Sequence, residues 1–382
     1  MNTRTDRAER GIATAIEILQ AGGVVALPTE TVYGLAGDAL SSDACAAIFE
    51  AKDRPLSDPL IVHLPSLDWL SRLTAPSPLA FALAEKFWPG PLTMVLQRSP
   101  SVPDIVTAGQ DTVAVRMSAH PAFRSVVKGF GKPLAAPSAN RFGRISPTAA
   151  EHVMSELGGR IPFILDGGPC RHGIESTIVH VLEERLQILR QGPVTEEQLR
   201  EFAPVFHGPA GVAAPGGLKS HYAPRTPLVI ADRPISRGPR AGLLAWSNAP
   251  EGFAVVERLS ISGDLREAAA NLYGAMRRLD EAGLDLTQDG ADLVAGTVTG
   301  SLAVQTTETA GNTVTAADGE TPYTYALNTG ANAVTVGTYG SIQLASDGSY
   351  VYTLDKAFDG ADADNGITTE TGKESFAYTA TD

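Results

Sequence analysis

Helix-like and strand-like segments alternate along the first two hundred residues of the chain. The periodic segment Arg7–Ala21 predicts a helix that ends at Gly22-Gly23, where glycine supplies a C-terminal cap. The short apolar run Val24–Leu27 predicts a buried strand, and Ser42–Ala51 predicts a second helix. Further strands are expected at Leu60–Leu64, Leu92–Leu96, Thr112–Met117, Leu134–Ala136, Pro162–Leu165, Thr177–Leu182 and Leu186–Arg190, and further helices at Leu79–Phe87, Thr148–Leu157 and Thr195–Phe202. The alternation predicts a mixed α/β fold whose polar motifs lie on loops at strand ends.

Two polar motifs stand out between these segments. Lys52 and Arg54 flank a single aspartate, and Ser138 and Asn140 flank a single alanine. In an extended segment, residues two apart point to the same side. The first pair is therefore expected to aim two cations at one place, and the second pair to aim two short hydrogen-bonding groups. Two cations with two neutral polar groups indicate a site for a polyanion such as a nucleoside triphosphate.

Length and composition set the outer limits of the interpretation. At 382 residues the chain is long enough for two or three domains that each bury a core. No apolar run approaches the roughly 20 residues of a membrane-spanning helix, and residues 1–10 lack the apolar core of a signal peptide. Cys45 and Cys170 have no metal-ligand spacing, which favours free thiols. A cytoplasmic protein without membrane contact is the resulting expectation.

Charge and composition divide the chain into unlike parts. Of the 43 acidic residues, 13 fall in Leu286–Asp382, which holds only two of the 30 basic residues. Residues 206–227 are rich in Pro, Gly and Ala, as linkers are. We therefore predict a first domain at 1–205, this linker, a small and truncated α/β second domain at 228–285 with a helix at Asp264–Ala282, and an acidic β-rich segment at 286–382.

The acidic segment has the alternating pattern of β-strands. Thr321–Leu327 and Ser349–Leu354 alternate, and Asp347-Gly348 is a typical hairpin turn, so an all-β sandwich is expected. Residues 339–382 resemble a repeat of bacterial surface adhesins, an Ig-like or cadherin-like module that often binds calcium. The acidic run at 359–366 departs from the helix-loop-helix calcium pattern, since Lys373 stands where that pattern needs Glu, and a solvated turn is expected there.

Several motifs of the first part follow one another in the order found in one enzyme family. They are Pro28–Leu35, Lys52–Arg54 with Pro59–His63, Trp88–Thr93, Val115-Arg116, Ser138–Asn140, Glu175–Thr177 and Leu189-Arg190. On these residues the chain resembles the threonylcarbamoyl-AMP synthase (YrdC-like) family over about residues 8–205. The linker run Lys219–Pro224 and the segment after it resemble the two-domain form of that enzyme. The resemblance implies a mixed-sheet domain with a concave, positively charged face.

The resemblance also implies a reaction. The family joins L-threonine, bicarbonate and ATP into threonylcarbamoyl-AMP and releases pyrophosphate, and downstream transferase proteins use the product to modify transfer RNA. The threonine amine captures carbon dioxide as a carbamate, whose oxygen attacks the α-phosphorus of ATP. Such chemistry needs charge neutralisation, positioning and exclusion of water more than a protein nucleophile.

Roles for individual residues follow from the same resemblance. Lys52 and Arg54 would act on the phosphates as catalytic cations, and Arg116 would face the threonine carboxylate. ATP would be bound by a set of polar and cationic side chains: Arg54, Asp58, Ser138, Asn140, Ser146, Arg190 and Tyr222, the last as a lid. Threonine would be surrounded by a second set: Thr31, His63, Arg116 and Ser176. Magnesium would enter with the triphosphate, held mainly by phosphates and water, so no protein metal site is expected.

Structural alternatives exist for several of these residues. A lone Lys52 is ordinarily a solvated side chain, because exposed ion pairs contribute only about 0–1 kcal/mol. His63 ends an apolar strand and could be a core histidine, Ser176 could cap a turn, and Tyr222 could only pack in the linker. Cys170 lies two residues from His172, but no third orienting group is evident, so nucleophilic catalysis is not expected.

Two functions of other classes compete with the synthase. An RNA-binding module would use the positive face without catalysis and would show a steep salt dependence. A surface adhesion protein would carry the synthase part as a passenger. Because a cytoplasmic enzyme and a secreted repeat belong to different compartments, we also hypothesise a chimeric chain with its join near residues 284–292.

Overall fold

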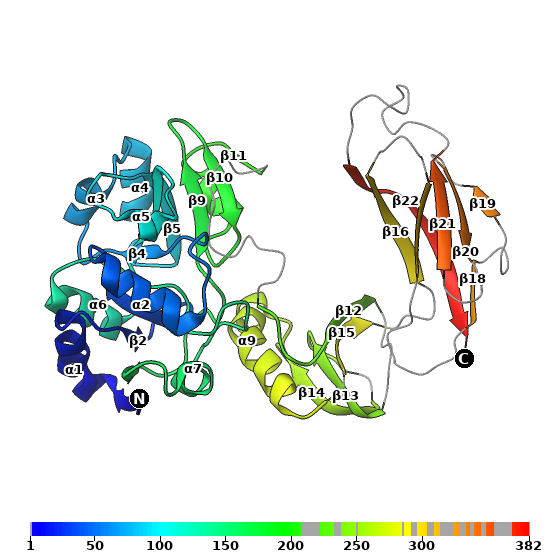
Figure 1. The fold of residues 1–382 in the computed structure, drawn as a ribbon, viewed down its shortest axis with the longest axis horizontal. Helices are drawn as coiled ribbons and strands as arrows, with labels where there is room; N and C mark the ends of the chain where they lie inside the picture. Colours follow the sequence, from blue (N-terminus) through cyan, green and yellow to red (C-terminus); the bar gives the residue numbers. More distant parts are fainter. Residues whose placement is uncertain are drawn as a thin grey trace. The chain divides into compact units, whose positions relative to one another are not determined.

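The structure is a computed structural model that describes residues 2–207, 222–232, 238–249 and 251–284, together with the backbone of strands between residues 286 and 381 (Figure 1). The chain forms two compact units. The first contains Met1–Arg225, Trp246–Asn248 and Glu257–Ala282, and the second contains Thr226–Ala245, Ala249–Val256 and Gly283–Asp382. The first unit therefore includes the whole predicted first domain and a helix that follows the linker.

A mixed sheet of 11 strands runs through the first unit in the order β1-β8-β2-β3-β7-β4-β6-β5-β9-β10-β11. Its strands are β1 Arg4–Arg7, β2 Val25–Leu27, β3 Gly34–Asp38, β4 Ile61–His63, β5 Leu92–Gln97, β6 Thr112–Arg116, β7 Leu134–Ala135, β8 Phe163–Asp166, β9 Thr177–Val181, β10 Leu186–Arg190 and β11 Val205–Phe206. Strand β4 is parallel to β6, whereas β5 is antiparallel to β6. The predicted mixed α/β class is confirmed.

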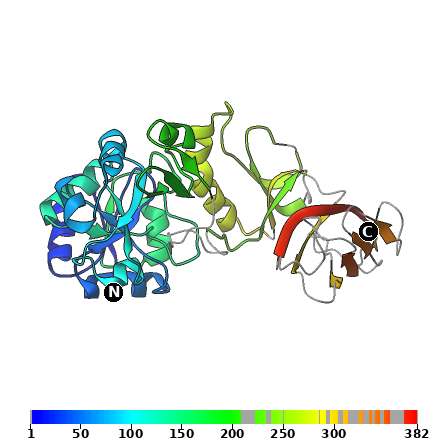
Figure 2. The ribbon, with the colours of Figure 1, turned by 90° about the horizontal axis from the view of Figure 1, so that it is seen from above.

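Helices cover both faces of this sheet (Figures 1 and 2). One face carries α1 Ala8–Gln20 and α6 Pro121–Phe130; the other carries α2 Ser42–Lys52, α3 Asp68–Leu73, α4 Pro78–Phe87, α5 Asp104–Thr107 and α7 Ala150–Leu157, with α8 Glu196–Arg200 packed at the edge. Around β2 the side chains alternate between the two faces of the sheet. Val25 and Leu27 pack in the core with α1 and α6, whereas Val24 and Ala26 pack in the core with α2 on the other face. The apolar run was a sign of a strand that is buried on both faces.

Six elements of the first unit escaped the sequence patterns, namely β1, β3, β11, α3, α5 and α6, and two of them are instructive. Strand β3 has the sequence Gly-Leu-Ala-Gly-Asp, which lacks the β-branched residues typical of strands. Helix α6 had a usable signal: Pro121 stands at its first turn, and Phe123, Val126 and Val127 recur at helical spacing on its buried face. Both elements are held by contacts with the sheet.

Helix α9, Leu265–Glu281, belongs to the first unit. Sequence analysis placed it in the second domain. The side chain of Tyr273 packs in one cluster with Val32 and Ile145, and Arg277 forms a buried ion pair of 3.2 Å with Glu156 of α7. These contacts attach α9 to the first 225 residues.

The second unit contains a sheet in the order β12-β15-β13-β14. Its strands are β12 Leu228–Asp232, β13 Gly238–Ala245, β14 Phe253–Arg258 and β15 Leu286–Ala291. Strand β15 is parallel to both β12 and β13, between which it lies. This sheet therefore includes a strand beyond residue 285, where the sequence analysis places the end of the second domain.

The remaining strands of the second unit form two antiparallel groups, β16-β22-β18 and β17-β21-β20-β19. They are β16 Gly296–Ala303, β17 Thr309–Thr313, β18 Thr324–Leu327, β19 Val334–Val336, β20 Gly340–Leu344, β21 Ser349–Leu354 and β22 Thr369–Thr381. The Asp347-Gly348 turn, the acidic run at 359–366 and the linker residues 208–221 lie outside the described residues. In the described part of the chain, no helix has the length and apolar character needed to cross a membrane.

Candidate active site

A pocket of about 440 Å³, counting the space at its open mouth, lies in the first unit. Its wall combines cationic, hydroxyl and apolar side chains from strands β4, β6 and β10 and from the loops beside them. The lining residues are Thr29, Thr31, Val32, Gly34, Arg54, Ile61, His63, Arg116, Ala136, Pro137, Ser138, Glu175 and Arg190. Six of the predicted site residues are among them: Thr31, Arg54, His63, Arg116, Ser138 and Arg190.

Strand pairing places two of these side chains side by side. In the parallel pair of β4 and β6, His63 is the register partner of Arg116. Val62 points into the core beneath α2, so the alternation of the strand turns Ile61 and His63 to the pocket face. The pocket therefore lies at the C-terminal ends of the adjacent strands β4 and β6.

His63 is neutral at this position. Its side chain is 2% exposed, and burial together with the charge of Arg116 lowers its pKa to about 3. The ring packs against Phe123 with 4.6 Å between centroids, and its Nδ1 atom has no hydrogen-bond partner among the described residues. His63 is thus both a core histidine and a lining residue, which the sequence left as alternatives.

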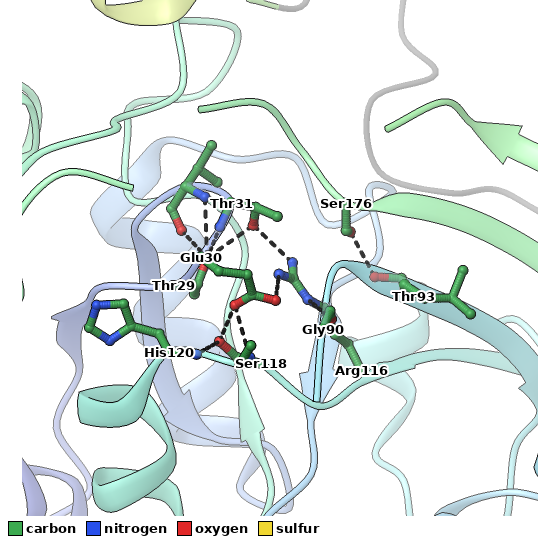
Figure 3. Close-up of polar contacts among 12 residues, drawn as sticks. Thr29, Glu30, Thr31, Gly90, Thr93, Arg116, Ser118, His120 and Ser176 are labelled. Carbon is green, nitrogen blue, oxygen red and sulfur yellow. Dashed lines mark hydrogen bonds and ion pairs between the residues drawn. The ribbon is translucent and has the colours of Figure 1, made fainter. Parts of the chain in front are cut away.

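Arg116 ends β6 and is held on three sides (Figure 3). Its Nη2 atom donates to Glu30 Oε1 at 2.6 Å, Nη1 donates to Thr31 Oγ1 at 3.0 Å, and Nε donates to the carbonyl oxygen of Gly90 at 3.3 Å. The arginine is 3% exposed. Its orientation is therefore set before any ligand arrives.

Glu30 was missed by sequence reasoning, although it lies in the quoted run Pro28–Leu35. Burial on its own raises the pKa of this carboxyl, but the charge of Arg116 and hydrogen bonds from Ser118 and Arg116 outweigh it and bring the pKa to about 2. Its Oε2 atom accepts from Ser118 Oγ at 2.5 Å and from the backbone N–H of Ala119 at 3.0 Å. The available signal was the position of Glu30 inside that run, because its partner Arg116 lies 86 residues further along the chain.

Arg54 is the second arginine of the pocket. Its Nη2 atom lies 2.9 Å from Asp58 Oδ2 and donates to Pro59 O at 2.7 Å, while Nε donates to Asp58 O at 3.1 Å. Burial raises the pKa of the Asp58 carboxyl, and Arg54 and Lys52 oppose that rise. Asp58 therefore acts as a buried support for Arg54 and does not line the pocket.

Lys52 differs from its expected placement. It is the last residue of α2, and Asp53 caps this helix in the left-handed conformation with φ 53°, so the Lys52–Arg54 segment is not extended. The Nζ atom donates to the carbonyl oxygens of Ser138 and Asn140, both at 2.5 Å, and Lys52 is not a lining residue. The direction of the lysine is therefore set by the last turn of α2 and not by the alternation of an extended strand.

The Ser138–Asn140 motif is also split. Ser138 lines the pocket, and its backbone forms an isolated antiparallel β-bridge with Gly34. Asn140 is 1% exposed, and its Nδ2 atom donates to the carbonyl oxygens of Arg141 and Arg144 at 2.8 and 2.9 Å. The asparagine side chain thus stabilises the loop that follows it, and of the two residues the serine is the one that lines the cavity.

Arg190 and Glu175 close the remaining side. Arg190 Nη2 donates to Ser176 Oγ at 3.0 Å and lies 3.7 Å from Glu175 Oε2. Glu175 Oε1 accepts from Ser146 Oγ at 2.7 Å. Ser176 and Ser146 are fully buried supports that do not line the pocket, while Glu175, which sequence analysis left without a role, does.

Tyr222 lies near this side of the pocket from the end of the linker. Its ring stacks on Tyr273 of α9, with 5.5 Å between centroids and 18° between planes, and its φ is 60°. Burial and the charge of Glu175 raise the pKa of its hydroxyl, while Arg190 opposes the rise. These interactions place Tyr222 beside Glu175 and Arg190, though outside the lining set.

Two buried arginines and a partly buried third, with interspersed hydroxyl groups, give this α/β protein a pocket with the chemistry of a site for small anions. Cys170 stays outside the lining set, and burial raises the pKa of its thiol. Within the described ranges, no three His, Cys, Asp or Glu side chains cluster so as to hold a metal ion.

Comparisons with known proteins extend this class to a family. A family profile described as "Telomere recombination" matches residues 17–192, and one described as "Threonylcarbamoyl-AMP synthase, C-terminal domain" matches residues 194–311. The threonylcarbamoyl-AMP synthase of Bacillus subtilis is 40% identical over 296 residues, which cover 72% of this chain and 86% of the relative. The chain therefore belongs to the threonylcarbamoyl-AMP synthase family.

Relatives from an archaeon agree. The threonylcarbamoyl-AMP synthase of Pyrococcus abyssi is 37% identical over 310 residues, or 75% of this chain and 90% of the relative. The crystal structure of P. abyssi Sua5 complexed with L-threonine matches with a TM-score of 0.69 and 35% identity, over 76% of this chain and 92% of that chain. The match of the second profile to residue 311 also runs past the boundary predicted at residue 285.

Proposed function

We propose that this chain is an L-threonylcarbamoyladenylate synthase, which makes threonylcarbamoyl-AMP and pyrophosphate from L-threonine, bicarbonate and ATP. The observation that carries the proposal is the meeting of Arg54, Arg116 and Arg190 in one pocket. Each comes from a different part of the chain and each lies near its own carboxylate: Asp58 and Glu30 are buried, and Glu175 is partly buried. Family membership and the L-threonine complex of P. abyssi Sua5 support the same reaction.

The two kinds of anion need separate cations. Arg116 is held by Glu30 and Thr31, which suits a carboxylate such as that of threonine. Arg54 and Arg190 both lie near Glu175 and Tyr222, and they suit the phosphates of ATP. Lys52 would act on the nucleotide through the Ser138 loop that it holds.

The reaction places few chemical demands on side chains. The threonine amine combines with carbon dioxide from bicarbonate to form a carbamate, and a carbamate oxygen attacks the α-phosphorus of ATP. The bond from the α-phosphorus to the bridging oxygen breaks, and pyrophosphate leaves. The arginines would neutralise the charge of both anions and hold them together in a largely buried site.

Other parts of the reaction mixture are proposals of the same kind. Magnesium would accompany ATP and would be held mainly by phosphate oxygens and water. Tyr222 would act as a lid over the bound nucleotide. We place the reaction in the cytoplasm, with downstream transferase proteins and transfer RNA as partners of the product.

Pyrophosphate release tests the function. Wild type should release pyrophosphate only when threonine, bicarbonate and ATP are all present. Arg54→Ala should reduce the rate on the order of 10²-fold, because it removes a preorganised cation. Arg200→Ala is the control, since this exposed arginine pairs with Glu196 on α8 and does not line the pocket. ATP turnover that does not depend on threonine would refute the proposal, and strong RNA binding without turnover would favour an RNA-binding module.

The fused adhesin-like repeat remains a separate proposal. The antiparallel pairing of β16–β22 is compatible with a β-rich module. Since β15 pairs with β12 and β13, the join would fall after Ala291. Limited proteolysis with mass spectrometry would reveal preferential cleavage soon after this residue if the repeat is an independent module.

A further inference from the structure

We propose that Glu30 is the positioning residue for the threonine carboxylate, because it fixes the guanidinium of Arg116 in the orientation that the ligand needs. The inference rests on the proposed function, since threonine is the ligand whose carboxylate Arg116 would bind. Glu30 would never touch threonine. It would set how strongly and how selectively the site takes a ligand with a carboxylate.

The carboxylate of Glu30 is fully engaged with protein groups. Its Oε1 atom accepts from Arg116, and its Oε2 atom accepts from Ser118 Oγ and from the N–H of Ala119 (Figure 3). Glu30 is 6% exposed and is not a lining residue. A direct role on the substrate is thereby disfavoured, and its influence on the pocket passes through Arg116.

The N–H groups of Arg116 divide into those that bind protein atoms and those that are left for a ligand. An arginine has five N–H groups. Contacts with Gly90, Thr31 and Glu30 use three of them within the described residues. Two N–H groups are left, one on each terminal nitrogen, and two donors are what a carboxylate takes from an arginine in a bidentate pair.

The backbone that carries Glu30 is fixed as well. Thr29 Oγ1 accepts from the N–H of Thr31 at 3.1 Å and from that of Val32 at 3.2 Å, and it donates to Val32 O at 2.6 Å. The carbonyl oxygen of Glu30 accepts from the N–H of His172 at 2.8 Å. This turn directs Thr29 and Thr31 to the pocket while Glu30 points inward to Arg116.

Charge supports the same assignment. An arginine buried without a counter-charge is costly, and a paired carboxylate offsets that cost. Because the pKa of Glu30 is about 2, this carboxylate keeps its charge throughout the range in which enzymes are assayed. Arg116 is therefore presented with a compensating negative charge beside it.

The test is a cycle between protein and ligand. Wild type and Glu30→Gln are titrated by calorimetry with L-threonine and with L-threoninamide, in which a neutral amide replaces the carboxylate. Glu30→Gln should weaken L-threonine binding about tenfold or more, while leaving L-threoninamide and ATP binding within about twofold. A general structural effect would weaken all three ligands together.

Two further variants keep the outcome clear. Glu156→Gln removes an equally buried carboxylate from its pair with Arg277, so it should lower the thermal midpoint without changing the ratio of threonine to threoninamide affinity. Ser118→Ala removes one hydrogen bond to Glu30 and keeps its charge, so it should shift the same ratio in the direction of Glu30→Gln by a smaller factor. If Glu30→Gln does not fold, Ser118→Ala decides.

Failure of the inference differs from failure of the proposed function. If wild type binds threonine and the ratio of threonine to threoninamide affinity is unchanged in Glu30→Gln, then Glu30 does not position the carboxylate site. If Glu30→Gln does not fold, an unchanged ratio in Ser118→Ala leads to the same conclusion. If wild type itself shows neither threonine binding nor threonine-dependent pyrophosphate release, the proposed function is wrong.

Discussion

The Nζ atom of Lys52 donates a hydrogen bond of 2.5 Å to the backbone carbonyl oxygen of Asn140. The last residue of α2 thereby holds the loop whose Ser138 lines the pocket. Burial, and after it the charge of Arg54, lowers the pKa of this lysine from 10.5 to about 7. The interaction has consequences for stability that can be measured.

Lys52→Met should remove a pH dependence of stability on the alkaline side. A lysine with a lower pKa in the folded state destabilises that state while it is charged, and this cost disappears as the pH rises from about 7 to about 10.5. The free energy of unfolding of wild type minus that of Lys52→Met should therefore increase by up to about 1.4 kcal/mol per pH unit in this interval. Urea denaturation at several pH values measures it, and a flat difference would contradict the assignment.

Glu30→Gln should remove a pH dependence on the acid side. Since the pKa of Glu30 is lowered from 4.5 to about 2, its stabilising contribution is present above pH 4.5 and is lost as the pH falls toward 2. The difference in free energy of unfolding between wild type and the variant should decrease by on the order of 3 kcal/mol over that range. Guanidinium denaturation between pH 6 and pH 2 tests it, with Glu156→Gln as the comparison.

Two adjacent arginines of α9 should differ strongly in their effect on stability. Arg277 pairs with Glu156 at 3.2 Å, with both side chains buried, and it also donates to the carbonyl oxygen of Ile145. Arg277→Ala should cost about 3–5 kcal/mol, because it leaves a buried carboxylate without its partner. Arg278 pairs with Glu257 at the surface, so Arg278→Ala should cost less than about 1 kcal/mol. Similar losses in chemical denaturation would show that α9 is not anchored through Arg277.

Gly173 should not tolerate a side chain. Its φ is +65°, and a Cβ atom would clash with the carbonyl oxygen of Ala270 in α9. Gly22 has a φ of +82° and no described atom within 4 Å of such a Cβ. A substitution at Gly22 therefore measures the cost of the left-handed backbone conformation without a steric clash. Gly22→Ala should cost about 1–2 kcal/mol, and Gly173→Ala should cost about 1–3 kcal/mol more. Equal shifts of the thermal midpoint would argue against close packing of α9 on this loop.

Local patterns were sufficient for many elements. The apolar run at β2 and the glycines that follow α1 each reflect the surroundings of a few consecutive residues. The same holds for the motifs that contain Arg54, Arg116 and Arg190. Strand β3 was missed because its residues have low strand propensity, and its neighbours β2 and β7 hold it by backbone hydrogen bonds.

The orientation of site residues was less accessible. The alternation rule failed at Lys52 because the helix continues through that residue and Asp53 closes it in the left-handed conformation. Asn140 was expected in the pocket, but the carbonyl oxygens of Arg141 and Arg144 take its side-chain amide. In both cases contacts with nearby backbone, and not the spacing of the residues, decide the direction of the side chain.

The sequence by itself determined the class of the fold, the places of most strands along the chain and most of the cationic and hydroxyl residues from which the pocket is made, because each depends on local periodicity or on residue chemistry. Only the tertiary structure decided which of those residues face the cavity and which support them. Glu30 meets Arg116, and Ser146 meets Glu175, across long separations in sequence. Such contacts depend on how the sheet and its loops pack, and no short-range pattern encodes them.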